Sequence, residues 1–159
     1  WPLSKVIEHH VTDKHVPPRT AFVTFDDGFA TVYTQAFPVL RDFGVPASVF
    51  VNTAYLDSSE PFPVDAWGLG YRGGAPVESY RPLTTEECRA MQSSNLVEIG
   101  AHTHTHADHR GDPEAFRRDV QLSVDIVRSK FALDEVMFAF PFGGRHTGFA
   151  SDELIQATK

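Results

Sequence analysis

Two short apolar segments, separated by one stretch of helical length, constrain the fold of this chain more than any other feature. Residues 21–26, AFVTFD, and residues 45–52, VPASVFVN, each predict a short buried strand. Between them, residues 29–43 place apolar side chains at helical spacing and are followed by Gly44, which predicts a helix that ends there. A strand, a helix and a strand in this order predict a parallel βαβ unit.

The same alternation of strand and helix continues along the chain. Further strands are predicted at residues 96–100 and 136–140, and further helices at residues 83–94, at residues 111–131 and from Ser151 onward. Two of these helices carry start signals, since Thr84 and Glu87 fit a capping box and Asp112 precedes a proline. Four strands alternating with helices predict an α/β fold, built as a parallel barrel or as a doubly wound sheet.

Residues 53–82 break this pattern. They contain four prolines and four glycines, which predicts a long irregular loop, and such loops in compact domains are often functional. Three aromatic residues of the loop, Trp67, Tyr71 and Tyr80, could stack on a sugar ring. They could equally pin the loop to the body of the domain, and the sequence leaves both interpretations open.

Length and composition exclude several classes of protein. The chain has 159 residues, enough for one domain with a core, and its net charge of −7 argues against a nucleic-acid partner. No apolar stretch approaches the roughly 20 residues of a membrane span. Cys88 is the only cysteine, which excludes an internal disulfide, and we expect a structural thiol. Because the chain begins at Trp1, we expect the natural N-terminus to lie upstream.

Polar residues gather at the ends of three predicted strands. The first strand runs into Asp26, Asp27 and Gly28, the third into residues 100–109, GAHTHTHADH, and the fourth into residues 140–144, FPFGG. In parallel α/β folds, active sites lie at the carboxyl ends of the strands. The coincidence predicts a catalytic site where these three segments meet.

The histidine-rich segment predicts a metal site. His102 and His106 are four residues apart, so on a helical turn they share a face and can bind one ion, while His104 points away. A carboxylate from Asp26 or Asp27 would complete a set of two histidines and one aspartate, which suits Zn²⁺ or another divalent transition metal. The alternative is a solvated polar loop that happens to be rich in histidine.

The same segment also fits a second metal motif. Residues 104–109 read H-x-H-x-D-H, which resembles the zinc-binding motif of the metallo-β-lactamase superfamily. That family also has further histidine and aspartate ligands downstream and an antiparallel sandwich. Here the only later histidine is His146, the chain predicts serial βα units, and the TFDDG segment would have no role.

Three segments together resemble the motifs of the polysaccharide deacetylase family, the NodB-homology domains of carbohydrate esterase family four. TFDDG at residues 24–28 resembles the first motif, HTHTH at residues 102–106 fits the second, H-[ST]-x-x-H, and FAFPFG at residues 138–143 resembles the third. The resemblance implies a distorted (β/α)7 barrel. It also implies that residues 1–159 belong to a single catalytic domain whose C-terminal part this chain lacks.

By this resemblance the metal ligands are Asp27, His102 and His106. Asp26 is the general base that activates a metal-bound water, and the backbone N–H of Phe142 stabilises the oxyanion formed on an N-acetyl group. The implied substrate-binding residues are Thr103, Pro141, Phe142 and Gly143. Thr103 is also expected to orient the histidine loop. Zn²⁺ suits the implied ligands best, with Co²⁺ and Ni²⁺ as alternatives.

The chain departs from the family pattern in two ways. Ala139 stands where the commoner third motif has an arginine that braces the base, and the FAFPFG form instead resembles the branch that acts on β-1,6-linked poly-N-acetylglucosamine. The fourth and fifth motifs, which include the histidine general acid, would follow residue 159. His146 lies too close to the third motif to replace that histidine.

The resemblance therefore implies a metal-dependent hydrolase that removes N-acetyl groups from a polysaccharide containing N-acetylglucosamine. Such a substrate implies an extracellular, periplasmic or cell-envelope location. A catalytically inactive carbohydrate-binding remnant that keeps the metal site is the alternative if the general acid has been lost. The oligomeric state is not predicted.

Overall fold

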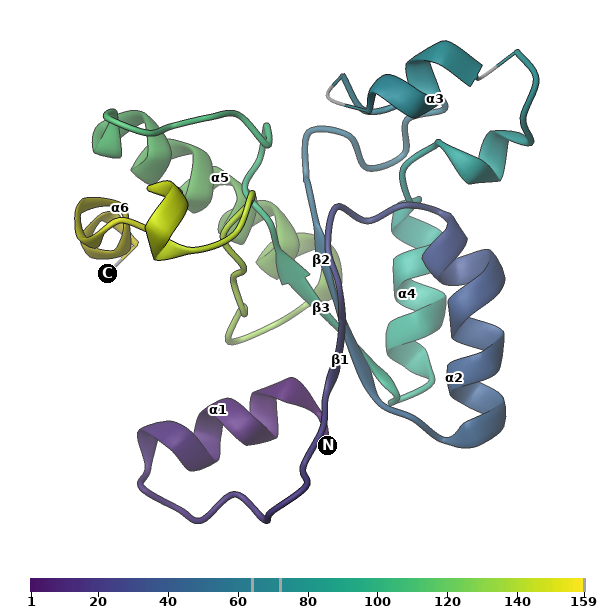
Figure 1. Ribbon diagram of the computed structural model, residues 1–159. Coiled ribbons are helices and arrows are strands. Elements are labelled where there is room, and N and C mark those ends of the chain that lie inside the picture. Colours follow the sequence, from purple (N-terminus) through teal and green to yellow (C-terminus); the bar gives the residue numbers. More distant parts are fainter. Residues whose placement is uncertain (64, 72, 159) are drawn as a thin grey trace.

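Three parallel strands form the centre of the computed structural model, which describes residues 1–63, 65–71 and 73–158 (Figure 1). The strands are β1 (Val23–Phe25), β2 (Ala47–Val51) and β3 (Val97–Ala101). They lie in the order β1-β2-β3, with Val23 opposite Ala47 and Ala47 opposite Val97, and both pairings are parallel. The predicted βαβ unit is confirmed.

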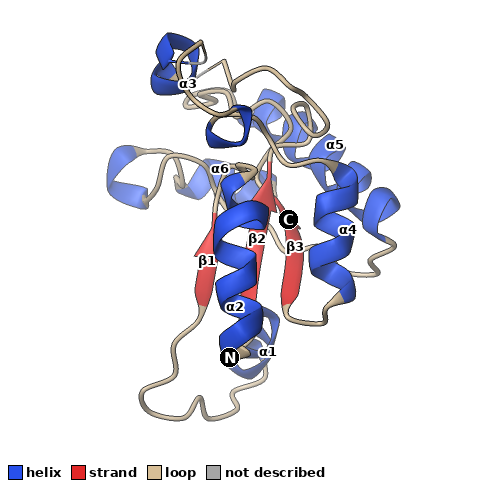
Figure 2. Ribbon diagram, turned by 90° about the vertical axis from the view of Figure 1, so that its right-hand side faces the viewer, coloured by secondary structure: helices blue, strands red, loops and turns tan. Residues whose placement is uncertain are grey.

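Helices surround this sheet. They are α1 (Leu3–Val11), α2 (Phe37–Phe43), α3 (Ala66–Tyr71), α4 (Thr85–Ser93), α5 (Pro113–Phe131) and α6 (Asp152–Ala157). Figure 2 shows α2 and α4 over one face of the sheet, and α3 beyond the end toward which the strand arrows point. Helix α5 contacts β3 and also α6. Among the described residues, no helix combines the length and apolar character needed to cross a membrane.

The helix predicted at residues 29–43 forms in two parts. Val32–Ala36 is a π-helix, whose wider turn ends with a hydrogen bond from Phe37 N–H to the carbonyl of Val32, and α2 continues from there. Pro38 explains the change of pitch, because it has no N–H for the carbonyl four residues earlier and its ring crowds that carbonyl. Gly44 ends the helix as predicted, with a left-handed φ of 62°.

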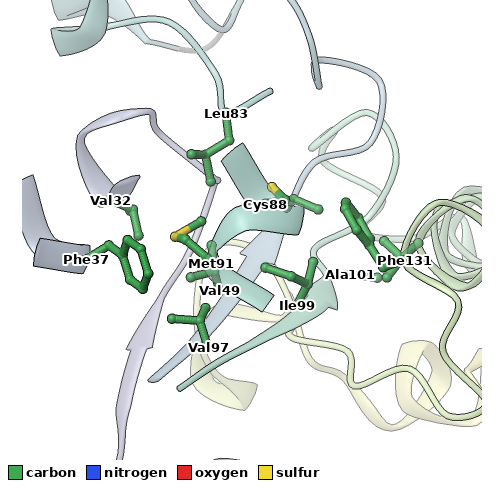
Figure 3. Close-up of a cluster of buried hydrophobic side chains, with 12 residues drawn as sticks. Val32, Phe37, Val49, Leu83, Cys88, Met91, Val97, Ile99, Ala101 and Phe131 are labelled. Carbon is green, nitrogen blue, oxygen red and sulfur yellow. The ribbon is translucent and has the colours of Figure 1, made fainter. Parts of the chain in front are cut away.

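The core lies between the sheet and the helices that cover it. Figure 3 shows Val49 and Ile99 of the sheet gathered with Phe37 of α2 and with Cys88 and Met91 of α4. Cys88 is fully buried, and burial raises the pKa of its thiol to about 12. The thiol therefore stays protonated at neutral pH and is unreactive, which confirms the prediction of a structural cysteine.

The prediction of a fourth strand at residues 136–140 is wrong. Phe138 alone forms a parallel bridge to the sheet, opposite Ala101, and no strand lies beyond it in the described part of the chain. The rings of Phe138 and Phe140 instead pack against Phe116 of α5. The apolar composition that predicted a strand therefore reflects packing on a helix.

The region 53–82 is less irregular than predicted. It contains α3 and a short 3-10 helix at Val77–Ser79. Tyr80 is only 9% exposed, which fits a residue that pins the loop to the domain. The side chains of Trp67 and Tyr71 lie outside the described part of the structure, so both interpretations stay open for them.

Helix α1 was not predicted. None of its residues is buried, so its apolar residues pack against no core. Its attachment to the sheet is polar, because the backbone N–H and the hydroxyl of Ser4 both donate to Glu98 of β3. Glu98 also accepts a hydrogen bond from the hydroxyl of Ser48 on β2. A periodic apolar pattern could not reveal an attachment of this kind.

Candidate metal centre

Asp27, His102 and His106 meet at the carboxyl end of the sheet. Nε2 of His102 lies 3.5 Å, and Nε2 of His106 lies 3.2 Å, from Oδ1 of Asp27. The three ligand atoms lie within 4.8 Å of one another, and the described residues contain no second group of this kind. Two imidazoles and a carboxylate at this spacing can bind one divalent ion and leave positions open for other ligands.

A tight turn after β1 directs Asp27 toward the histidines. Asp27 has a left-handed φ of 68°, Gly28 follows at 76°, and Gly28 N–H donates to the carbonyl of Asp26. A Cβ on Gly28 would lie 3.0 Å from Cγ1 of Val51, so both the conformation and the space require glycine. The sequence left open which of the two aspartates joins the histidines, and the structure brings Asp27 to them.

Asp26 lies beside this group but outside it. It is exposed, and its carboxylate makes no hydrogen bond or ion pair with the described residues. Ala139 stands where the commoner family motif has a bracing arginine, and it contributes only its backbone to the site. Its carbonyl oxygen lies 2.9 Å from Nδ1 of His102. Because a carbonyl can only accept, Nδ1 carries the proton and the lone pair of Nε2 faces Asp27.

The two histidines come together through a loop, which corrects the helical turn that their spacing predicted. Thr103 and His106 both have left-handed backbones, with φ of 66° and 55°. A right-handed helix does not accommodate such residues. Nδ1 of His104 lies 2.9 Å from the hydroxyl of Thr53, so this ring does turn away from the pair.

Thr103 holds the histidine loop from within. Its side chain is fully buried, and its hydroxyl accepts a hydrogen bond of 3.1 Å from the N–H of His106. The residue therefore orients the loop and fixes the second histidine. Its assignment as a substrate-binding residue stays a prediction, which its burial does not favour.

Asp119 of α5 is a second support, and no sequence pattern predicted it. Its carboxylate accepts hydrogen bonds from the N–H of His104 and from the N–H and hydroxyl of Thr105, over 2.6 to 3.2 Å. Asp119 is only 9% exposed, so these bonds replace most of its contact with water. The loop between His102 and His106 is thereby anchored on α5.

Replacing Asp119 with asparagine should weaken both the fold and the metal centre. The new NH₂ group would face backbone donors, so we expect the free energy of unfolding to fall by about 2–3 kcal/mol. We also expect zinc affinity to fall by about 10- to 100-fold, as for other groups that orient ligands. Asp125→Asn, on the exposed side of α5, is the control. Denaturant titration and competition with a zinc chelator measure the two effects, and unchanged values would contradict the anchoring role.

The histidines also keep Asp27 ionised. Interaction with the neighbouring imidazoles, that of His102 first and then that of His106, holds the pKa of the Asp27 carboxyl far below its ordinary value, although partial burial opposes this effect. Asp27 therefore remains a carboxylate at the pH values at which proteins are normally handled. The carboxylate is the form that binds a cation.

The third predicted segment forms another wall of the site. Phe142 is 43% exposed, with ring centroids 4.3 Å from His106 and 4.8 Å from Phe149. Its backbone has a φ of 62°, and its N–H has no hydrogen-bond partner among the described residues. Pro141 is buried, whereas Gly143 is exposed with a φ of 103°. The segment thus offers the unpaired backbone N–H of Phe142, a residue whose ring contacts His106.

A cavity of about 280 Å³ adjoins the metal centre. The described residues that line it are Asp27, Phe29, Asn52, Phe62, Asp65, His106 and Phe142. Asn52 was missed although it gave a signal, since it is a polar residue directly after an apolar strand. Its Nδ2 donates to the carbonyl of His102 over 2.6 Å. Asp65 comes from the loop at residues 53–82, which the sequence marked as a candidate functional loop without pointing to this residue.

Comparison with known proteins decides the family. Residues 13–158 match the family model for polysaccharide deacetylases. The chain belongs to the polysaccharide deacetylase family. A poly-β-1,6-N-acetyl-D-glucosamine N-deacetylase of Staphylococcus epidermidis is 24% identical over 152 residues, which cover 90% of this chain and 45% of that protein. A protein of the same name from Escherichia coli K12 is 24% identical over 183 aligned residues, covering 96% of this chain and 26% of that protein.

The fold of this chain is also seen in a solved structure. The Streptococcus pyogenes deacetylase PplD in complex with acetate superposes with a TM-score of 0.73 and 19% identity, over 99% of this chain and 59% of that one. This likeness confirms the predicted α/β fold of the deacetylase type, of which the described residues form a part. The chain spans less than half the length of the two curated relatives.

The family match and the geometry do not favour the metallo-β-lactamase interpretation of residues 104–109. Asp108 pairs with the exposed Arg110, whose hydrogen bonds lower the pKa of the Asp108 carboxyl to about 2. Nε2 of His109 lies 3.8 Å from Asp119, on α5. With His104 bonded to Thr53, the segment's potential ligands point to different partners, and only His106 joins the metal centre.

Proposed function

We propose that this protein is a metal-dependent N-deacetylase that acts on a polysaccharide containing N-acetylglucosamine, of the β-1,6-linked type. The observation that carries the proposal is the convergence of Asp27, His102 and His106 at the end of the sheet. Family membership and the names of two curated relatives support the same reaction and the same polymer. The reaction would release acetate and leave a free amine on the sugar.

The donor set favours zinc as the ion. Two neutral imidazoles and one carboxylate suit Zn²⁺, and they also accept Co²⁺ and Ni²⁺. The hydrogen bond from His102 to Ala139 supports this choice, because it directs the basic nitrogen of that ring to Asp27. A divalent cation held here supplies the Lewis acidity that hydrolysis of an acetamide needs.

Asp26 and Phe142 would contribute the other reactive groups beside the metal centre. Asp26 is exposed and free of partners among the described residues, so its carboxylate can accept the proton that the attacking water loses. The free N–H of Phe142 can donate to the oxyanion that develops on the acetyl oxygen. We also assign Pro141 and Gly143 to the wall against which the substrate lies.

The same proposal implies a domain assignment and a cellular location for the protein. Residues 1–159 would belong to one NodB-like catalytic domain. A polymer of N-acetylglucosamine lies outside the cytoplasm, so the protein would act in the extracellular space, the periplasm or the cell envelope.

Release of acetate from N-acetylated β-1,6-linked glucosamine oligomers tests this function. We expect the zinc-loaded, full-length protein to release acetate, a chelator to stop the release, and added Zn²⁺ to restore it. Equal release after complete removal of metal would contradict metal dependence. Zinc binding without acetate release from β-1,6- or β-1,4-linked oligomers would instead favour a carbohydrate-binding remnant.

A further inference from the structure

The cavity beside the metal centre contains a second acid that is not a metal ligand. Asp65 lines the cavity together with Asp27, but it does not belong to the group of three ligand residues. It is half-buried and lies in the long loop that crosses the carboxyl end of the sheet, just before α3. Figures 1 and 2 both show α3 beyond that end of the strands.

The loop holds the carboxylate of Asp65 in a fixed place. Oδ1 accepts a hydrogen bond of 3.0 Å from the N–H of Gly68, in the first turn of α3. Backbone bonds from Asp65 N–H to Phe62 and from Leu69 N–H to Asp65 fix the residue further. A Cβ on Gly68 would overlap Oδ2 of Asp65 and would lie 2.9 Å from Cβ of Tyr80. The carboxylate therefore occupies a space that exists only because residue 68 is glycine.

The chemistry of the cavity suits a sugar ring. Its lining includes three aromatic rings, Phe29, Phe62 and Phe142, which suit the apolar faces of a pyranose. Asp65 has one oxygen that the bond from Gly68 does not use, and a carboxylate only accepts hydrogen bonds. Sugar hydroxyl groups are donors that such an oxygen can bind strongly.

We infer that Asp65 is a substrate-binding residue, whose carboxylate accepts hydrogen bonds from hydroxyl groups of the N-acetylhexosamine that occupies the cavity. The inference rests on the proposed function and adds to it a group that positions the sugar. The metal centre would engage the acetamide, and Asp65 would hold the ring on the other wall. A carboxylate that served only to cap α3 would have no effect on sugar binding.

Asp65→Asn separates these two roles. Asparagine caps a helix as well as aspartate does, so its carbonyl oxygen can keep the bond to Gly68, while an NH₂ donor replaces the other oxygen. Asp112→Asn is the matched control, because Asp112 caps α5 through the same kind of bond, 2.9 Å to Ala115 N–H, and does not line the cavity. Gly68→Ala displaces the carboxylate without removing it.

The measurements are the Kd of the zinc-loaded, full-length protein for an N-acetylated β-1,6-linked glucosamine trimer and the KM and kcat of acetate release. We expect Asp65→Asn to raise Kd and KM by about 10- to 100-fold with a smaller effect on kcat. Gly68→Ala should do the same, the double variant should be no worse than Asp65→Asn, and Asp112→Asn should match the wild type. Zinc content and melting temperature report whether the variants fold.

Two results would separate a failure of the inference from a failure of the function. Normal Kd and KM in folded Asp65→Asn would overturn the inference and leave the deacetylase proposal standing. A wild type that binds the trimer but releases no acetate would overturn the deacetylase proposal, while the Kd values still decide the role of Asp65. A wild type that neither binds the trimer nor releases acetate from it would overturn both proposals.

Discussion

Asp26→Asn is expected to lower kcat for acetate release at least about 100-fold while the protein still binds zinc with wild-type affinity. Asp26 lies next to the proposed ligand Asp27 in the chain, yet its side chain is exposed and makes no hydrogen bond or ion pair with the described residues. Asparagine has nearly the same shape but cannot take a proton at neutral pH. The substitution therefore removes the proposed base and leaves the proposed ligand set of Asp27, His102 and His106 intact.

Steady-state assays of acetate and metal analysis of the same sample measure this effect. Asp134→Asn is the control, because Asp134 is also exposed but lies in the turn after α5, away from the site. Full activity of Asp26→Asn would show that another group accepts the proton. Loss of zinc in this variant would show that Asp26 is itself a ligand.

His102→Ala is expected to abolish stable zinc binding, with zinc affinity reduced more than about 100-fold, and acetate release should disappear with it. Among the three proposed ligands, His102 is the most deeply buried. Its side chain is almost wholly buried, and Nδ1 of the ring faces the carbonyl of Ala139. Its backbone N–H donates to the carbonyl of Val51. Removing the ring leaves one imidazole and one carboxylate, which are too few protein ligands for a stable zinc site.

His104→Ala is the matched control for this loss. His104 lies in the same loop, but its ring bonds to Thr53 and points away from the ion. We expect this variant to keep its zinc. Competition with a chromophoric chelator gives both affinities, and circular dichroism shows whether each variant is folded. Equal zinc affinity of His102→Ala and the wild type would remove His102 from the ligand set.

The strands and helices that could be predicted were those with local causes. The βαβ unit follows from apolar runs and from Gly44, and α4 starts where Thr84 and Glu87 form their capping box. The strand prediction at residues 136–140 was wrong because an apolar run that packs on a helix has the same composition as a buried strand. Composition cannot distinguish the two when the partner is distant in the chain.

In the candidate site, too, some residues could be predicted from the sequence and others could not. Spacing pointed to His102 and His106 with either Asp26 or Asp27, and only the family resemblance named Asp27, while the helical turn expected to join the histidines was wrong. The spacing of the histidines reveals neither the left-handed backbone of Thr103 nor the bond from the N–H of His106 to its hydroxyl. Asp119 and Asp65 escaped prediction because their partners are backbone N–H groups, which every residue offers alike.

The central claim is that one ion is bound jointly by Asp27, His102 and His106. A crystal structure of the protein grown with zinc, with anomalous data collected at the zinc edge, tests it most directly. The account predicts one anomalous peak about 2.0–2.2 Å from a carboxylate oxygen of Asp27 and from Nε2 of both histidines. A zinc peak elsewhere, or these three side chains too far apart to share an ion, would contradict it.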